Sequence, residues 1–508
     1  MSPALLVVPV AAPLAAAGVL VLAGRRSPVL VRVVGWGVSA LVLAVGAVLL
    51  AATVEGQLTT ARLGGWPPGI AIVLVADVLS ALLLVVTSAL VLVSLVFAAA
   101  TGEDDGSFVP LALVLSTGVY GALLTGDLFN LFVFVEVMLV PSYVLLVAGG
   151  GARRLAAGRR YLAVNLLAST LFLAGVGLVY GVTGTVALGE LAGAAAAPEV
   201  GIAGAVVLVP VAVKAAVVPL HSWLPGSYAA AGPAVVVLFS GLLTKVGVYA
   251  LYRIWSVVFD GDRRWLWLLM AAGVATMVIG VLGAVGERTM RSVLTFHMVS
   301  QIGYMVVGLA LSTVAGLAAG IFFLVQYVLV KAALLMCAGA VEVTHGTDEL
   351  ARLRGLGRRE PALAVAFGLS ALALVTAPPL SGFVAKLALL DATLDAGQHV
   401  AAGVVVVVSL LTLTSMLKVW NAVFTEAAPE PGGPGAAGPD AGPGQPGVVV
   451  APPATRPRVR PALVAPALLL AILAVGLGIW AEPLLAVADA AARGLVDTTA
   501  YVTAVTSS

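Results

Sequence analysis

Five lysines are the residues of this 508-residue chain whose type and spacing best fit a chemical task. Lys214, Lys245, Lys331, Lys386 and Lys418 all lie within apolar segments, whereas the basic residues of the connecting segments are arginines. Lysines that only made the surface soluble would occur in the connections. Lysine exchanges its proton readily when it is removed from water, while arginine keeps its charge. The lysines are therefore suited to binding and releasing protons.

One glutamate and two histidines add further groups that can exchange protons. Glu136 lies midway along the apolar run GDLFNLFVFVEVMLVPSYVLL, where a carboxylate needs a proton or a cationic partner. We expect Lys214 to be that partner; the alternative is a structural glutamate hydrogen-bonded to a neighbouring helix. His297 in LTFHMVSQIGYM and His221 in PLHSWLPG are candidates because histidine titrates near neutral pH. A satisfied structural role is the alternative for both.

Other polar residues and motifs point to structure rather than chemistry. Lys418 lies near the end of its apolar run, where its ammonium group can reach the membrane surface. Asp77 and Asp127 lie close to helix ends and are expected to be solvated helix caps. The single cysteine, Cys337, allows neither a disulfide framework nor a cysteine metal site, and no phosphate-binding, CxxC or HExxH motif occurs. We therefore expect no cofactor, no metal and no enzymatic active site.

The composition places these residues in a membrane. Hydrophobic residues make up 61% of the chain and charged residues only 10%, which is typical of a polytopic membrane protein. The net charge of +2 gives no indication of a nucleic-acid partner. No basic segment precedes the first apolar run, so we expect that run to be a retained span rather than a signal peptide.

The predicted fold is an all-α bundle of about fourteen transmembrane helices. The apolar runs that can each cross about 30 Å of hydrocarbon are residues 4–23, 29–53, 69–98, 108–125, 127–149, 161–182, 200–230, 232–254, 265–286, 289–311, 315–341, 361–396, 399–424 and 461–482. The seventh and twelfth are interrupted by proline and glycine, and irregular backbone at this depth is tolerated only inside protein or beside a cavity. A broken helix beside a lysine is typical of a transporter core.

The two broken helices also suggest an internal repeat. Each carries one lysine beside its break, so we expect helices 4–8 and 9–13 to be equivalent five-helix units, inverted because five is odd. We therefore expect N-terminal helices in residues 1–107, a first repeat in 108–254 and a second repeat in 265–424. A Pro/Gly-rich cytoplasmic linker follows in 427–460, and a C-terminal helix with its tail in 461–508. With the N-terminus outside, most arginines fall in cytoplasmic connections, which predicts that both termini are outside.

Five segments together resemble a known family. They are GDLFNLFVFVEVMLVPSYVLL, VKAAVVPLHSWLPGSY, GLLTKVGVYALYR, SQIGYM and PPLSGFVAKLALL. They are similar to the proton-translocating membrane subunits that respiratory NADH–quinone oxidoreductase (complex I) shares with Mrp-type multisubunit antiporters. The resemblance runs from about residue 69 to residue 424, and the form of GDLFNLFVFVE is most similar to the D subunits of Mrp antiporters. It implies fourteen helices, inverted five-helix repeats, a central polar axis and a bacterial cell membrane.

The resemblance also assigns roles to individual residues. Glu136 matches the glutamate of the family's axis, and Lys214, Lys245, Lys331 and Lys386 match its lysines, the last of them leading to an exit.

One departure from the family pattern is visible in the run FFLVQYVLVKAALL. Gln326 and Tyr327 stand where relatives often have a histidine before the lysine. Proton transfer to Lys331 would then need water or these two side chains.

The favoured interpretation is a subunit of a monovalent cation (Na⁺)/H⁺ antiporter, not an enzyme. It would move H⁺ along intramembrane glutamate, lysine and histidine side chains and water, within a hetero-oligomer that lies in the lipid bilayer. The alternative is a proton-pumping membrane subunit of NADH–quinone oxidoreductase or of a membrane-bound hydrogenase. A non-transporting scaffold is a third possibility, which the intramembrane lysines argue against. Gene neighbourhood would separate the first two.

Overall fold

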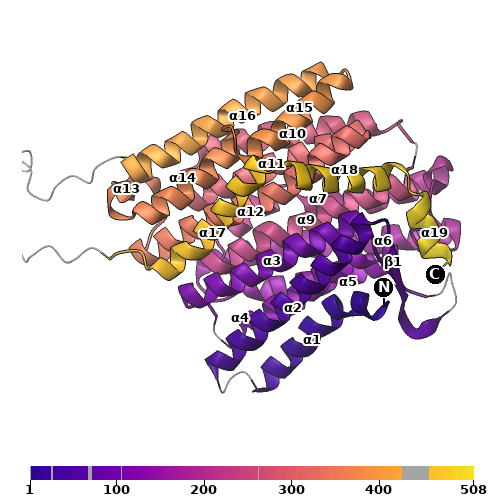
Figure 1. The fold of residues 1–508 in the computed structure, drawn as a ribbon, viewed down its shortest axis with the longest axis horizontal. Helices are drawn as coiled ribbons and strands as arrows, with labels where there is room; N and C mark the ends of the chain where they lie inside the picture. Colours follow the sequence, from indigo (N-terminus) through magenta and orange to yellow (C-terminus); the bar gives the residue numbers. More distant parts are fainter. Residues whose placement is uncertain are drawn as a thin grey trace, which may run out of the picture.

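The computed structural model describes residues 2–23, 27–66, 71–104, 106–260, 262–425 and 457–507, most of them in helices packed side by side in one bundle (Figure 1). Twelve helices in these residues are long and apolar enough to cross a membrane. They are α1 (Ala4–Ala23), α2 (Pro28–Val54), α3 (Val78–Thr101), α5 (Leu128–Val147), α6 (Ala152–Thr183), α7 (Pro198–Ala215), α9 (Pro233–Val258), α10 (Leu266–Gly286), α11 (Met290–Leu311), α12 (Val314–His345), α16 (His399–Trp420, continued by the π-helical turn Asn421–Thr425) and α17 (Pro461–Ile479).

Two shorter apolar helices, α4 (Phe108–Leu124) and α14 (Pro361–Val375), complete the set. Every predicted span thus has a helix at its place, which confirms the helical membrane fold. The crossing of all fourteen, the inverted repeats and the division into domains stay predictions. The predicted linker lies mostly outside the described residues, which resume at 457.

The third predicted span was wrong in its first part. Residues Thr59–Arg62 (β1) pair antiparallel with Val73–Ala76 (β2), and α3 begins only at Val78. The helix begins there because the Asp77 carboxylate accepts a hydrogen bond from the Ser80 amide at 2.9 Å, while the Asp77 amide donates to the Ser80 hydroxyl. The short apolar segment before Asp77 does not by itself distinguish strand from helix, so the sequence did not reveal this hairpin.

The first predicted break is confirmed between α7 and a short helix, α8 (Trp223–Tyr228). Helix α7 ends at Ala215, and Ala216 adopts a left-handed conformation with φ of 59°. The end of α7 leaves backbone carbonyls without helical partners. Near this end the carbonyl of Val213 accepts from the Ala216 amide and also from the Trp223 indole N–H, the latter at 2.8 Å.

The second predicted break is confirmed between α14 and α15 (Ser381–Asp395). Helix α14 ends at Val375, and Thr376 is left-handed with φ of 84°. Here a lysine satisfies a free carbonyl: Lys386 Nζ of α15 donates back across the break to the carbonyl of Leu374 at 3.1 Å. The lysine therefore joins the two halves of its own broken segment.

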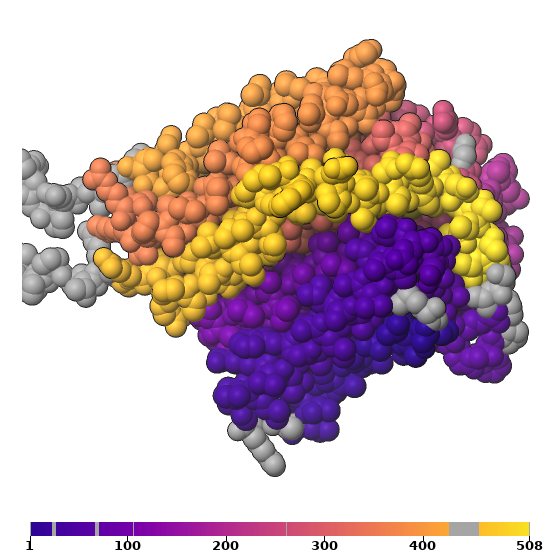
Figure 2. Space-filling view, in the orientation of Figure 1, coloured from indigo at the N-terminus to yellow at the C-terminus, as the bar shows by residue number. Residues whose placement is uncertain are grey.

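The C-terminal residues form two helices where only a tail was predicted. Helix α18 (Glu482–Val496) contacts α12, α3 and α9, and α19 (Thr499–Ser507) contacts both strands. Figure 2 shows this segment as a yellow band between the N-terminal helices and α14–α16. The remaining short elements are η2 (Leu63–Gly65), η3 (Ala194–Ala196), η4 (Leu350–Arg352) and α13 (Leu356–Arg359).

Helices α9, α11 and α12 form the centre of the bundle and are buried along almost their whole length. Helices α1, α2 and α6 lie at the periphery and expose many apolar side chains, as helices in contact with lipid do. The start of α1 and helix α19 lie at one end of the bundle, while α13 and the start of α17 lie at the other (Figure 1). The candidate lysines of α9 and α12 are therefore central.

Candidate functional site

Helix α6 places two polar side chains against Lys214. Asn165 and Ser169 are four residues apart, so they share one face of the helix. Lys214 Nζ donates to the backbone oxygen and Oδ1 of Asn165 at 3.2 and 3.1 Å and to Ser169 Oγ at 3.2 Å. The Ser169 hydroxyl in turn donates to Glu136 Oε1. The expected link between Glu136 and Lys214 is present, but it passes through a hydroxyl group instead of a direct ion pair.

Glu136 itself is only partly buried. It lies on a side of α5 where Val140 is 59% exposed and Phe129 is 46% exposed. Glu136 therefore lies partly at the surface of the chain, in the middle of an apolar helix.

Lys245 of α9 and Lys331 of α12 meet at one aromatic ring. Their ammonium nitrogens lie 4.6 and 5.8 Å from the centre of the Tyr327 ring, within reach of cation–π attraction. Lys245 also donates to the Ser240 carbonyl at 2.8 Å and to the Thr244 hydroxyl at 3.2 Å. The residue that departs from the family pattern thus lies beside both lysines.

Several buried polar atoms of α11 and α12, Lys331 Nζ among them, have no direct partner among the described residues. Lys331 Nζ, the Tyr327 hydroxyl, Gln326 Oε1 and both amide atoms of Gln301 make no hydrogen bond within the described part of the chain. Buried polar groups are normally hydrogen-bonded to protein or to water. This region is therefore suited to hold water inside the bundle.

A close contact connects the first lysine to the second. A methyl group added to Gly247 of α9 would lie 2.8 Å from the carbonyl carbon of Lys214. Only glycine lets the backbones of α7 and α9 approach this closely. Gly247 is two residues after Lys245, so the contact brings the end of α7 beside the centre of α9.

His297 and Lys386 continue the arrangement on the other side of Lys331. The His297 ring is fully buried in α11, and its Nε2 lies 2.7 Å from Ser415 Oγ of α16. Its charged neighbours include Lys331 and Lys386. Lys386 Nζ lies 5.1 Å from the centre of the Tyr304 ring. Glu136, Lys214, Lys245, Lys331 and Lys386 are called the lysine series below. The four lysines lie on successive neighbouring elements, α7, α9, α12 and α15, and Glu136 of α5 is linked to Lys214 through Ser169 of α6.

Two other predicted candidates lie apart from the lysine series. His221 lies half-buried in the turn between α7 and α8, and no hydrogen bond in the described structure joins it to a lysine. Lys418 donates to the carbonyls of Val285 and Glu287 at 2.6 and 2.7 Å. It therefore binds the end of α10, where a cation is favourable, rather than simply reaching the membrane surface.

Asp77 has a structural role that the sequence revealed only in part. It caps α3 as expected, but it is mostly buried and pairs with Arg253 at 2.5 Å. The Arg253 guanidinium is 1% exposed and lies 4.4 Å from the Tyr501 ring of α19. Burial favours the protonated acid, yet the Arg253 charge and the Ser80 amide together hold the pKa of Asp77 below its ordinary value. Asp127 likewise caps α5, accepting from the Asn130 amide, and it too is buried.

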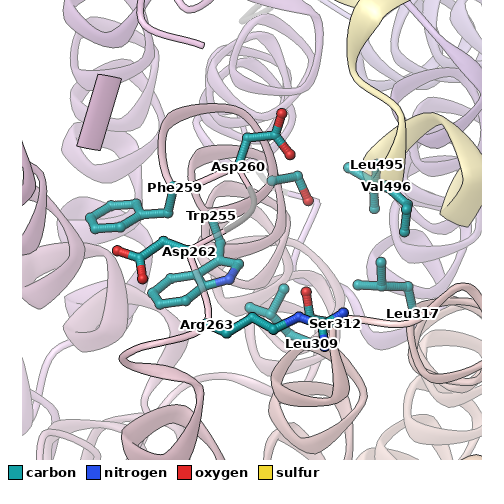
Figure 3. A pocket seen from close by; sticks show the side chains of 11 residues that line it. Trp255, Phe259, Asp260, Asp262, Arg263, Leu309, Ser312, Leu317, Leu495 and Val496 are labelled. Carbon is teal, nitrogen blue, oxygen red and sulfur yellow. The ribbon is translucent and has the colours of Figure 1, made fainter. Parts of the chain in front are cut away.

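A cavity of about 130 Å³ lies at the end of α9, away from the lysine series (Figure 3). The carboxylates of Asp260 and Asp262 on its wall point in different directions, and Asp262 is paired with Arg264 at 2.8 Å. Among the described residues, no group of three His, Cys, Asp or Glu side chains is placed to hold a metal ion. Among the described residues, the cavity therefore offers no metal site.

Asn165, Ser169 and Ser415 were missed in the sequence. The first two had a signal, because their spacing of four in the predicted span puts both on one face of the helix. Ser415 had none, since isolated serines in apolar helices usually bond to their own backbone.

This fold and this set of buried ionisable side chains define an ion-translocating membrane protein. The chain belongs to the family described as NADH:quinone oxidoreductase/Mrp antiporter, TM, whose model matches residues 125–412. This confirms the resemblance noted in the sequence.

Individual proteins that are similar to this chain agree with this family assignment. The chain is 38% identical over 429 residues to the D subunit of a Na⁺/H⁺ antiporter from Alkalihalophilus pseudofirmus, covering 83% of this chain and 87% of the relative. It is 34% identical over 407 residues to the N subunit of an NADH–quinone oxidoreductase from Desulforudis audaxviator, covering 77% and 80%. Among solved structures, a chain of the Mrp complex from Dietzia sp. superposes with a TM-score of 0.91 at 46% identity, covering 98% of each chain.

Proposed function

We propose that this chain is the proton-translocating subunit of a multisubunit Na⁺/H⁺ antiporter and that the lysine series is its proton path. The observation that carries the proposal is that four lysines lie buried on successive neighbouring elements, α7, α9, α12 and α15. An intramembrane lysine is costly, about 3 kcal/mol each on insertion scales. A chain that keeps four of them in its interior uses them for transport.

The first step takes place between Lys214 and Glu136. Ser169 accepts a hydrogen bond from Lys214 and donates one to Glu136. When the hydroxyl passes its own proton to the carboxylate and takes one from the ammonium group, a proton moves from Lys214 to Glu136 and both charges disappear. The reverse transfer restores them.

The second step takes place across the Tyr327 ring. Two ammonium groups beside one ring repel each other when both are charged. Proton uptake at Lys245 therefore favours release from Lys331. The released proton has His297 and Lys386 as its next acceptors, and the break between α14 and α15 gives Lys386 access to water at one side of the membrane.

The partly exposed Glu136 supports a partner subunit on this face. A carboxylate in contact with lipid is unfavourable, so another protein surface has to cover α5 in the assembled complex. We propose sister subunits of the same complex as these partners, Na⁺ as the coupled ion, and a bacterial plasma membrane with both termini outside.

The test is antiport by the assembled complex in everted membrane vesicles. Glu136→Gln removes the charge but keeps the shape, and it should abolish ΔpH-driven Na⁺ exchange at matched expression. The control is Glu199→Gln, which changes an exposed glutamate in the first turn of α7 and should leave exchange unaltered. Full exchange by Glu136→Gln would refute the proposal.

The similarity to a subunit of NADH–quinone oxidoreductase keeps one alternative, a proton-pumping subunit of a redox complex. The same vesicles distinguish the two. Exchange of Na⁺ for H⁺ without an electron donor supports the antiporter, whereas proton movement that requires NADH supports the redox complex.

A further inference from the structure

We propose that Ser415 of α16 is a positioning residue that keeps the proton of neutral His297 on Nε2, so that His297 exchanges transported protons through Nδ1. The inference rests on the proposed function, in which His297 belongs to the proton path. It adds a residue from a helix that carries no member of the lysine series.

The direction of two hydrogen bonds carries the inference. Ser415 Oγ lies 2.9 Å from the carbonyl of Thr412, and a carbonyl can only accept, so the single hydroxyl proton points there. Toward His297 Nε2, at 2.7 Å, the same oxygen can therefore only accept. Nε2 has to carry a proton to make this bond. A neutral imidazole has one N–H, so Nδ1 keeps its lone pair.

The other ring nitrogen of His297, Nδ1, is left without a partner in the described part of the chain. His297 is 0% exposed, and its Nδ1 is buried with no hydrogen-bond partner among the residues described. The charged groups that interact with His297 come from three neighbouring helices: Lys331 of α12, Lys386 of α15 and Lys418 of α16. All are lysines, so the ring is placed to take a proton from one lysine and to pass it to another.

The proton transfer then balances at a single atom. An ammonium group of Lys331 gives its proton to Nδ1, which leaves a neutral amine and an imidazolium ion. The imidazolium releases that proton from Nδ1 to the neutral amine of Lys386. The Nε2 proton stays in place, because Ser415 could accept it only by passing its own proton to a backbone carbonyl, which is not a base.

Nuclear magnetic resonance of the assembled complex tests the tautomer directly. The complex is labelled with ¹⁵N-histidine, and the spectrum of a His297→Asn complex is subtracted to isolate the His297 signals. At alkaline pH we expect protonated Nε2 and unprotonated Nδ1. A proton on Nδ1 would overturn the inference.

Antiport as a function of pH tests the consequence. Ser415→Ala removes an acceptor that stabilises the imidazolium ion more than the neutral ring. Loss of one such bond changes the protonation equilibrium about fivefold, which shifts the pH of half-maximal antiport downward by about 0.7 unit. Ser415→Thr keeps the hydroxyl and should restore the profile. The control, Ser370→Ala, removes a buried hydroxyl that donates to Ala366 of its own helix, and its profile should match the wild type.

The two proposals can fail separately. An unshifted Ser415→Ala profile overturns this inference, and if Glu136→Gln still abolishes exchange, the proposed function stands. Full exchange by Glu136→Gln overturns the proposed function itself.

Discussion

Replacement of Ser169 by alanine isolates the hydroxyl group that links Lys214 to Glu136. In the variant, Lys214 keeps both hydrogen bonds to Asn165, whereas Glu136 loses the bond that Ser169 donates. Hydrogen bonds to charged groups contribute about 1.5–3 kcal/mol each. If one such bond is lost in the transfer step, the rate falls about 10-fold to 100-fold.

The measurement is initial Na⁺/H⁺ exchange in everted vesicles, with the amount of assembled complex determined for each variant. Thr170→Ala is the matched control, because Thr170 is the next residue, is exposed and bonds to the Leu166 carbonyl of its own helix. It should exchange at the wild-type rate. Ser169→Thr keeps a hydroxyl and should recover most of the activity. Wild-type exchange by Ser169→Ala would show that the proton does not pass through this hydroxyl group.

Three further variants test other parts of the structure. Lys386→Arg should assemble yet lose most exchange, because arginine keeps the charge but does not release its proton; full exchange would mean that this lysine supplies only charge. Tyr327→Leu should reduce exchange more than Tyr327→Phe, since phenylalanine keeps the ring beside Lys245, and equal losses would assign the effect to the hydroxyl. Asp77→Asn leaves the buried Arg253 unpaired and should lower the free energy of unfolding by about 3–5 kcal/mol at neutral pH. Because the pKa of Asp77 is lowered in the folded state, its carboxylate stabilises the fold fully above about pH 4 and loses this effect in more acidic solution. Thermal unfolding at decreasing pH should therefore show a shrinking difference in stability between Asp77→Asn and the wild type.

The lysines and the helix breaks could be predicted because each contradicts its surroundings. A charge or a proline in an apolar run is costly unless the fold uses it, so Lys245 and the two breaks were visible without a structure. Ser169 and Ser415 were not singled out, because a serine costs little in a membrane helix. Ser370, for example, simply donates to its own helix. Only tertiary contacts distinguish a linking serine from a structural one.

The errors at the ends of the chain have different causes. The strand Val73–Ala76 and the start of α3 are both apolar, on either side of Asp77, and short apolar segments without periodicity do not distinguish strand from helix. Helix α18, in contrast, could have been predicted. Its buried residues recur at helical spacing, namely Leu484, Ala488, Ala491, Ala492 and Leu495. The segment is too polar for a membrane span, and a search for spans alone passes over it.

The partners of the basic side chains separate structure from transport. Buried arginines pair with carboxylates: Arg253 with Asp77, and Arg291 with Glu342. Neither partner can lose its charge without leaving the other unpaired, so these pairs hold the fold. The lysines of the series that make hydrogen bonds instead donate to neutral oxygens of serine, threonine, asparagine and the backbone. A lysine bound in this way can give up its proton and leave no buried anion behind. Proton release from these lysines is therefore compatible with a fold whose permanent charges stay paired.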